Sequence, residues 1–422
     1  MKKMMTIVLA VVASWGVSAR VAVDSIWRKD VRTVVMFNST TGDNPQKALP
    51  VPMLTLGARG RLVVEFDVMG TRSERLHWSI RHCDRCWVPD DLQPEEFMTG
   101  FAEGTIEDFE FSFTTTVEYV HYRCLLPDRY AAFTHSGNYE LTISSEEDLG
   151  KSGVLLTRRF CVSEQKTTVR ATNTRPYDGI GVGRRQEVDV AVATDQRPEY
   201  LTVAVQQNGR LDNMRLLEFS GYEGQAVLFA NRQCNIFDGG NTFRYFDCSN
   251  LRGTGYNVSS VENYGGEQFV VLNPEDDRSR KHYLNETVLN GGMKVNIWDR
   301  ENPRLEADYV WVNFSLPMQQ PYMDGNVHVV GAITDWKMDS TSMMQYNPTI
   351  KAYTLRLFLK QGYYSYQLLY ANGQYSQWES KTAQLEGDHS ETSNRYTVYV
   401  YQHTPADRGD RLLAVKSFIA IR

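Results

Sequence analysis

Acidic side chains crowd one short stretch of the sequence. HCDRCWVPDDLQPEEF (82–97) carries five carboxylates, namely Asp84, Asp90, Asp91, Glu95 and Glu96. A glycoside hydrolase needs two carboxylates about 5 to 10 Å apart, so this stretch could support glycoside hydrolysis. Pro89 and Pro94 also lie within it, and such a composition is typical of an exposed loop. We therefore favour a solvated loop, and a glycoside-active enzyme is the weaker alternative.

The cysteines raise a second kind of chemistry. Cys83 and Cys86 form a CxxC pair, and His121 with Cys124 could complete a set of zinc ligands. Both pairs lie in strand-like runs, where residues three apart point to opposite faces, so structural cysteines are the better interpretation. The sequence has no GxSxG, HExxH, P-loop or dinucleotide-binding glycine pattern. We therefore predict no catalytic residue, no metal and no cofactor.

The N-terminus has the features of a secretion signal. Lys2 and Lys3 precede an apolar run (4–17), and Ala19 precedes the expected cleavage position. Because about 14 apolar residues fall short of the roughly 20 that span a bilayer, we predict a signal peptide (1–19) and no embedded segment in the mature chain. The net charge of the 422-residue sequence is −6, without a basic block, so we predict no nucleic-acid partner.

Short runs of alternating apolar and polar residues dominate the remaining sequence. LVVEFDV (62–68), LHWSIRH (76–82) and EVDVAVA (187–193) are examples, and turn sequences such as NGR and DGGN separate these runs. Regularly spaced short strands predict an all-β protein of antiparallel sandwiches with few helices.

Two polar, turn-rich stretches interrupt this periodicity, at 162–179 and, less clearly, at 314–326. They suggest boundaries between folded units. We therefore predict three immunoglobulin-like β-sandwich domains in tandem, at residues 24–163, 164–318 and 319–422.

Two phrases of the last hundred residues, VHVVGAITDW (327–336) and LFLKQGYYSYQLLYANG (357–373), carry a specific likeness. They resemble early-set immunoglobulin-like modules that bind starch or glycogen. The resemblance implies that Trp336, Tyr364 and Trp378 could stack on sugar rings. Because such aromatic side chains are more often structural, and because a fold does not transfer a function, we favour core or interface positions. Carbohydrate binding remains the alternative.

A broader resemblance extends over nearly the whole mature chain. The segments that carry it include HCDRCWVPDDLQPEEFMTGFAEGTIEDFEFSFTT (82–115), RQEVDVAV (185–192), VQQNGRLDN (205–213), GGNTFRYFD (239–247) and EGDHSETSNRYTVYVY (386–401). Together they resemble one family, the plug proteins of the bacterial type IX secretion system. The resemblance implies a non-catalytic periplasmic protein at the inner face of the outer membrane. It also implies a partner, the outer-membrane translocon barrel, whose periplasmic mouth the plug closes when the channel is idle.

Candidate contacts with that partner follow from residue type. Aromatic and charged side chains are frequent anchors of protein interfaces. We select Trp87, Asp90, Asp91, Phe97 and Trp336.

Some cysteines depart from the family pattern. The resemblance leads us to expect an acidic residue at Cys86 and apolar residues near Cys124 and Cys248, so these thiols look like additions. For an exported chain we predict the disulfides Cys86–Cys124 and Cys234–Cys248. Cys83 and Cys161 are then either paired or buried free thiols.

Overall fold

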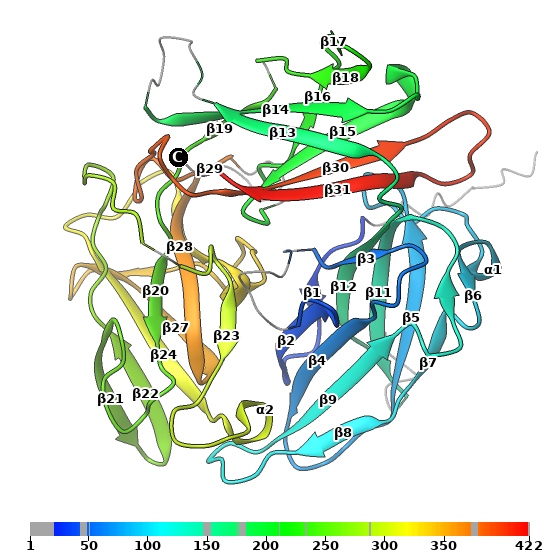
Figure 1. Cartoon of the computed structure of the whole chain (residues 1–422). Coiled ribbons are helices and arrows are strands. Elements are labelled where there is room, and N and C mark those ends of the chain that lie inside the picture. The colour runs from blue at the N-terminus through cyan, green and yellow to red at the C-terminus, as the bar shows by residue number, and fades with distance from the viewer. Residues whose placement is uncertain are drawn as a thin grey trace, which may run out of the picture.

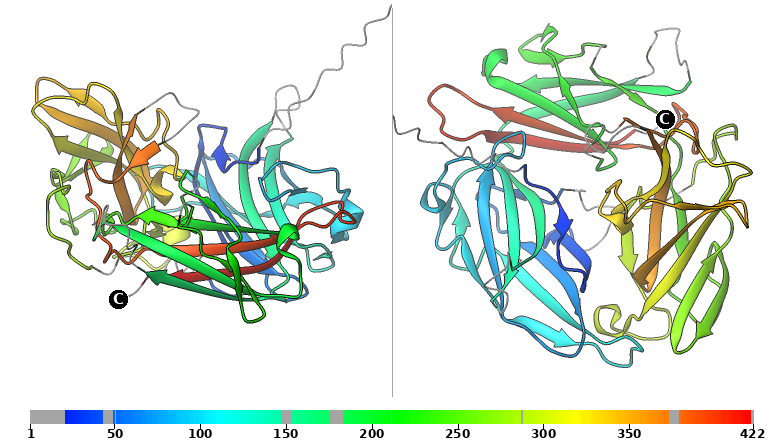
Figure 2. Two further views of the ribbon diagram at one scale, coloured as in Figure 1. Left: turned by 90° about the horizontal axis from the view of Figure 1, so that it is seen from above. Right: turned by 180° about the vertical axis from the view of Figure 1, so that it is seen from behind.

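The computed structural model describes residues 21–42, 49, 51–146, 153–174, 176, 183–210, 212–232, 234–286, 288–372 and 379–420. The predicted signal peptide and Trp378 lie outside the described residues. Within these ranges the protein is all-β, which confirms the predicted fold class, and its strands form three β-sandwiches around a common centre (Figures 1 and 2). No helix of this part of the chain is long and apolar enough to cross a membrane.

Helical structure in the described ranges is limited to single turns. The α-helices are α1 (Pro94–Phe97) and α2 (Pro303–Glu306), and the 3-10 helices are η1 (Pro198–Tyr200) and η2 (Ala332–Thr334).

The first sandwich contains strands β1 to β12. One sheet has the order β1-β12-β11-β5-β7 with β3 beside β12, the facing sheet has the order β2-β4-β9-β8, and β6 pairs with β10. The strands are β1 (Ser25–Ile26), β2 (Val31–Asn38), β3 (Met53–Thr55), β4 (Leu62–Met69), β5 (Leu76–Cys83), β6 (Met98–Thr99), β7 (Glu103–Ile106), β8 (Asp108–Phe111), β9 (Tyr119–Leu126), β10 (Ala132–Phe133), β11 (Gly137–Ser145) and β12 (Val154–Ser163).

Strand β4 shows how the alternating pattern builds this sandwich. Val64 and Phe66 point into the core between the two sheets, as the period of two in a strand requires. Glu65 and Asp67 therefore point to the opposite face, yet both are buried as well. They are buried because the third sandwich covers this face, so the outward side of β4 becomes a polar junction.

The second sandwich is built from two distant parts of the chain. One sheet has the order β13-β14-β18-β17 with β19 beside β14, and the other has the order β16-β15-β30-β31. The strands are β13 (Thr168–Thr174), β14 (Arg185–Ala193), β15 (Leu201–Gln207), β16 (Arg215–Leu217), β17 (Gly221–Glu223), β18 (Ala226–Phe229), β19 (Ile236–Asp238), β30 (Arg395–Gln402) and β31 (Arg411–Ile419). Figure 1 shows β30 and β31, coloured red, beside the green strands of this unit.

The third sandwich lies between β19 and β30 in the sequence. One side is centred on β28, which pairs with β20, β23, β25 and β29, and the other sheet has the order β21-β22-β24-β27-β26. The strands are β20 (Arg244–Asp247), β21 (Val258–Tyr264), β22 (Glu267–Leu272), β23 (Met293–Val295), β24 (Tyr309–Pro317), β25 (Asn326–Val330), β26 (Gln345–Asn347), β27 (Ala352–Lys360), β28 (Gly362–Asn372) and β29 (Glu379–Lys381).

This pairing differs from the predicted division at residue 318. The third core joins residues on both sides of that position, such as Phe246 and Phe314 with Val329 and Tyr366. Val203 pairs with Val400, so the last strands complete the second sandwich. The residues predicted as a separate early-set unit (319–422) are thus shared between two sandwiches. The stretch at 314–326 comprises the end of β24 and its connection to β25, so it lies within one sandwich and is not a linker.

Candidate functional site

The acidic stretch of the first sandwich lies against the second sandwich. Trp87, predicted as a partner contact, is buried in a cluster with Tyr399, Tyr401 and Leu412. The Arg159 guanidinium carbon lies 5.3 Å from the centre of the indole ring, within cation–π range. The Trp87 side chain is therefore committed to an internal junction rather than displayed on an open surface.

The carboxylates of this stretch have separate surroundings. His82 Nδ1 lies 2.6 Å from Asp90 Oδ2. Burial disfavours ionisation of Asp90, but the hydrogen bond and charge of His82 outweigh it and hold the pKa of the carboxyl below its usual value. Asp84 Oδ1 accepts the backbone N–H groups of Cys86 and Val88, both at 2.8 Å, and thereby fixes the turn. Asp84 therefore stabilises the local backbone, and Asp90 is paired with His82.

The remaining predicted contact residues of this stretch differ in exposure. Asp91 is exposed. Phe97 is fully buried in the core of the first sandwich, with its ring 5.6 Å from that of Tyr139. The structure therefore brings Trp87, Asp90, Asp91 and Phe97 to one region of the first sandwich without placing them on one surface.

Ion pairs also join the first and second sandwiches. Arg85 Nη1 lies 2.9 Å from Asp410 Oδ1, and Arg411 Nη2 lies 2.7 Å from Glu164 Oε1. The carboxylate of each pair is buried, whereas the arginine is partly exposed. Because each pair links residues far apart in the sequence, both fix the orientation of the two sandwiches.

A fully buried ion pair joins the first and third sandwiches. Lys360 Nζ, at the end of β27, lies 2.6 Å from Asp67 Oδ2 on β4, and each side chain is at most 2% exposed. Tyr309 donates its hydroxyl to the same Asp67 oxygen at 2.6 Å, and His121 Nδ1 lies 2.7 Å from the other oxygen. Burial opposes ionisation of Asp67, but Lys360 and His121 outweigh it and hold the pKa of Asp67 below its usual value.

The alternation of apolar and polar residues could not predict this ion pair. Asp67 occupies an outward position of β4, and the sequence pattern predicts that such a position faces solvent. Lys360 lies 293 residues away in the sequence. The one local signal is the pair of acidic residues, Glu65 and Asp67, within a strongly apolar strand.

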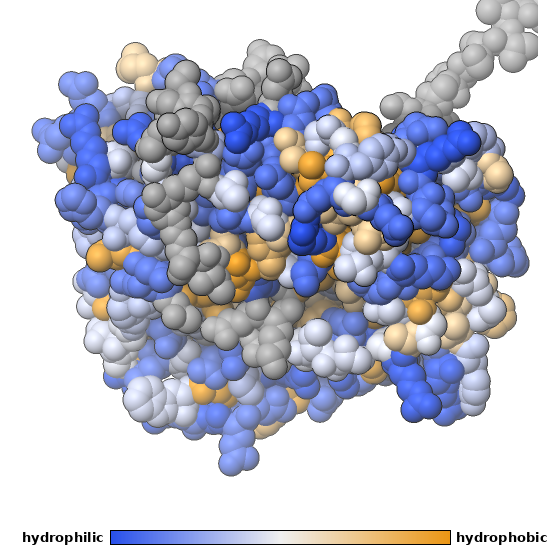
Figure 3. All heavy atoms as spheres, turned by 45° about the horizontal axis from the view of Figure 1, so that its top comes forward, coloured by the Kyte–Doolittle hydropathy of each residue, from blue (hydrophilic) through white to orange (hydrophobic). Residues whose placement is uncertain are grey.

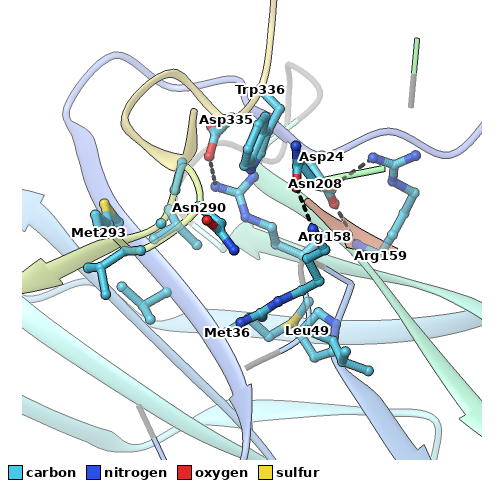
Figure 4. Close-up of a pocket in the computed structure, with 17 residues that line it drawn as sticks. Asp24, Met36, Leu49, Arg158, Arg159, Asn208, Asn290, Met293, Asp335 and Trp336 are labelled. Atoms are coloured by element: carbon cyan, nitrogen blue, oxygen red, sulfur yellow. Dashed lines mark hydrogen bonds and ion pairs between the residues drawn. The ribbon is translucent and has the colours of Figure 1, made fainter. Parts of the chain in front are cut away.

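The three sandwiches meet at a cavity of about 180 Å³ (Figure 4). Its wall combines Arg158 of the first sandwich, Asn208 of the second and Asn290 of the third. Arg158 Nη2 donates to Asp335 Oδ1 at 2.9 Å and thereby ties β12 to the turn after η2. Figure 3 shows one face of the whole molecule, which is mostly hydrophilic with hydrophobic residues scattered over it.

The aromatic side chains of the third sandwich that were candidates for sugar or partner contact pack against other residues of the protein. Trp336 lines the central cavity, with its ring 6.1 Å from that of Phe243. A Cβ atom at Gly291 would lie 2.2 Å from the indole, so the backbone there approaches as only glycine allows. Tyr364 is buried in the core and cannot stack on a sugar in this arrangement.

All six cysteines lie within the described residues, and all six are free thiols. Cys86 is exposed in the turn after β5, whereas Cys124 is buried in β9 of the opposite sheet. Cys234 belongs to the second sandwich and Cys248 to the third. The structure therefore contains neither predicted pair, because the members of each lie in different sheets or different sandwiches.

The structure does not bring the alternative zinc ligands together. His121 is engaged by Asp67, in a different sheet from Cys83. Among the residues that the structure describes, no three His, Cys, Asp or Glu side chains form a group able to hold a metal ion.

A hypothetical protein from Parabacteroides merdae ATCC 43184, known from a crystal structure, is 27% identical with a TM-score of 0.88, covering 95% of this chain and 100% of the other. Dimeric latent PorU from Porphyromonas gingivalis is 11% identical with a TM-score of 0.15, covering 92% of this chain and 34% of the other, a likeness that carries no argument. No curated protein matches this chain.

Residues 31–164, which make up most of the first sandwich, match the family described as "Type 9 secretion system plug protein 1st domain", and this match supports the plug-protein resemblance.

Proposed function

We propose that this protein is a non-catalytic periplasmic plug of the type IX secretion system. It binds the periplasmic mouth of the outer-membrane translocon barrel and closes the channel when no cargo is present. The observation that carries the proposal is the family match over residues 31–164. The predicted signal peptide (1–19) supports export to the periplasm, where the plug would lie against the inner face of the outer membrane.

The junctions between the sandwiches suit a plug. A body that blocks an aqueous pore must not deform when the channel is idle. The Asp67–Lys360 and Arg158–Asp335 pairs join the first sandwich to the third, and the Arg85–Asp410 pair joins it to the second. These contacts support a single stiff body rather than three flexibly linked units.

The proposal also constrains binding and release. A specific interface of this kind requires at least about 1,000 Å² of buried surface. Release requires the barrel to change shape, because a ligand shifts an equilibrium only by its differential affinity for the two states. The plug therefore binds the idle barrel more tightly than the cargo-loaded barrel, and it needs no nucleotide or cofactor.

Co-purification tests this proposal. We expect an affinity-tagged translocon barrel to recover the protein from outer membranes of cells without cargo, and to recover less of it when cargo occupies the barrel. A tagged outer-membrane barrel unrelated to secretion is the control. Absence of the protein from the idle translocon, under conditions that retain other subunits, would falsify the proposal.

A further inference from the structure

Strand β8 leaves one edge of the first sandwich open. It is the last strand of the order β2-β4-β9-β8, and among the described residues it pairs only with β9 (Figure 1). Phe109 and Phe111 lie on one face of this edge, and Phe113, two residues beyond the end of the strand, continues the row. An exposed apolar edge strand invites pairing with another chain, so proteins usually blunt or cover such edges.

The backbone of β8 presents unpaired groups outward. Ser112 N donates to Tyr119 O at 2.9 Å, so Ser112 faces β9. Because hydrogen-bonded pairs alternate in antiparallel strands, the N–H and C=O groups of Phe109 and Phe111 face away from β9. The outward N–H of Phe113 donates to Leu305 O at 3.1 Å, as this alternation requires. Within the described ranges no backbone group bonds to the outward groups of Phe109 or Phe111.

The phenylalanine row extends the core to the surface. Phe109, Phe111 and Phe113 are 38%, 50% and 48% exposed. The Phe109 ring lies 5.7 Å from Tyr122, whose ring stacks on Phe66 in the core at 5.4 Å. Apolar side chains of an added strand could cover this row and continue the sandwich.

The third sandwich holds the segment after β8 in place. Asp308 accepts the backbone N–H groups of Thr116 and Val117, at 2.7 and 3.0 Å. Arg300 Nη1 donates to Thr114 O at 2.8 Å. A partner would therefore meet a preorganised edge and would not need to order this segment itself.

The charge around the edge indicates the chemistry of its partner. Residues 101–118 contain no lysine or arginine. They contain five acidic side chains, all exposed, at Glu103, Glu107, Asp108, Glu110 and Glu118. Like charges directly opposite one another destabilise strand pairing, so two copies of this edge repel each other. A basic partner strand is complementary.

We propose that the free edge of β8 pairs with an extended segment of the translocon barrel. In this segment apolar and basic side chains alternate. The backbone of that segment bonds to Phe109 and Phe111, its apolar side chains cover the phenylalanine row, and its basic side chains face the acidic residues. This inference rests on the proposed function and names the contact through which the plug engages its partner.

Two substitutions at one residue separate ring contact from strand pairing. Phe111→Thr removes the ring and keeps the N–H group, whereas Phe111→Pro removes both. Proline is tolerated on an edge strand where the N–H group makes no ladder bond. Phe219→Thr is the matched control, because Phe219 is similarly exposed, at 46%, on the second sandwich. Thermal unfolding of each variant checks that it is folded.

The readout is recovery with the tagged idle barrel. We expect wild type and Phe219→Thr to be recovered equally, Phe111→Thr about tenfold less, and Phe111→Pro less again. If the barrel recovers wild type and both Phe111 variants equally, the inference is wrong and the proposed function stands. If the barrel does not recover wild type, both are wrong.

Amide hydrogen exchange of the wild-type protein gives a second readout that needs no variant. In complex with the barrel, the N–H groups of Phe109 and Phe111 should exchange at least about tenfold more slowly than in the free protein, because strand pairing would bond them. Unchanged exchange at these two amides in a saturated complex would overturn the inference even if the variants failed to fold.

Discussion

We expect a fragment of residues 239–389 to fold on its own and a fragment of residues 319–422 not to fold. This result is expected because the third core lies wholly between Phe246 and Leu385. A fragment that begins at residue 319 contains β27 without its partner β24, and β28 without its partners β20 and β23. It also leaves β30 without β15. The second fragment therefore exposes the halves of two cores and lacks the strands that would cover them.

Far-UV circular dichroism during heating measures this difference. The 239–389 fragment should unfold in one cooperative transition, and the 319–422 fragment should show none. A chain truncated after residue 389 is the companion variant. It should lose the second sandwich and keep the other two, because the sheet β16-β15-β30-β31 loses two strands. A cooperative transition in the 319–422 fragment would contradict the observed strand pairing.

Lys360→Met should destabilise the protein by about 3 to 5 kcal/mol, because it leaves the Asp67 carboxylate charged and buried without the ammonium group that faces it. Asp67→Asn should cost a similar amount by leaving the ammonium of Lys360 uncompensated. The double variant should cost less than the sum of the two, by about 1 to 3 kcal/mol, since it removes both buried charges. Chemical denaturation of the four proteins gives the coupling energy.

An exposed pair provides the control for this cycle. Arg75 Nη1 lies 3.3 Å from Glu146 Oε2, with both side chains largely in solvent, so the corresponding cycle should give less than about 1 kcal/mol. Additive effects of the Asp67 and Lys360 substitutions would show that the two side chains are not coupled across the junction.

The pKa of Asp67 gives the same junction a pH dependence. Since the folded-state pKa lies below the unfolded value of about 3.9, the ionised carboxylate stabilises the protein above that value, and this stabilisation is lost as the pH falls through the folded-state pKa. Asp67→Asn should therefore show a shallower loss of stability below about pH 4 than wild type.

Local patterns predicted the strands but not how they assemble. The alternation in LHWSIRH (76–82) is a property of neighbouring residues, and β5 forms there with the expected inward and outward faces. Nothing local states that Val203 pairs with Val400. The insertion of the third sandwich into the second therefore could not be predicted from periodicity, and a polar connection within a sandwich resembled a linker.

The candidate contacts show the same limit. Trp87 and Trp336 were selected by residue type, but their positions depend on the second and third sandwiches that pack against them. In contrast, FEFSF (109–113) alternates apolar and polar residues in the sequence, but its place at an unpaired edge follows only from the strand order. Residue type suggests a contact surface, whereas tertiary packing decides which side chains remain exposed.

Channel conductance tests the central claim most directly. The purified idle barrel is reconstituted in a planar bilayer, and the mature protein is added to the periplasmic side at a concentration that saturates binding. A plug predicts that the open-channel current falls to near the baseline, that addition to the opposite side has no effect, and that cargo restores the current. An unchanged current with the protein demonstrably bound would contradict the account, because a plug that binds without closing the pore is not a plug.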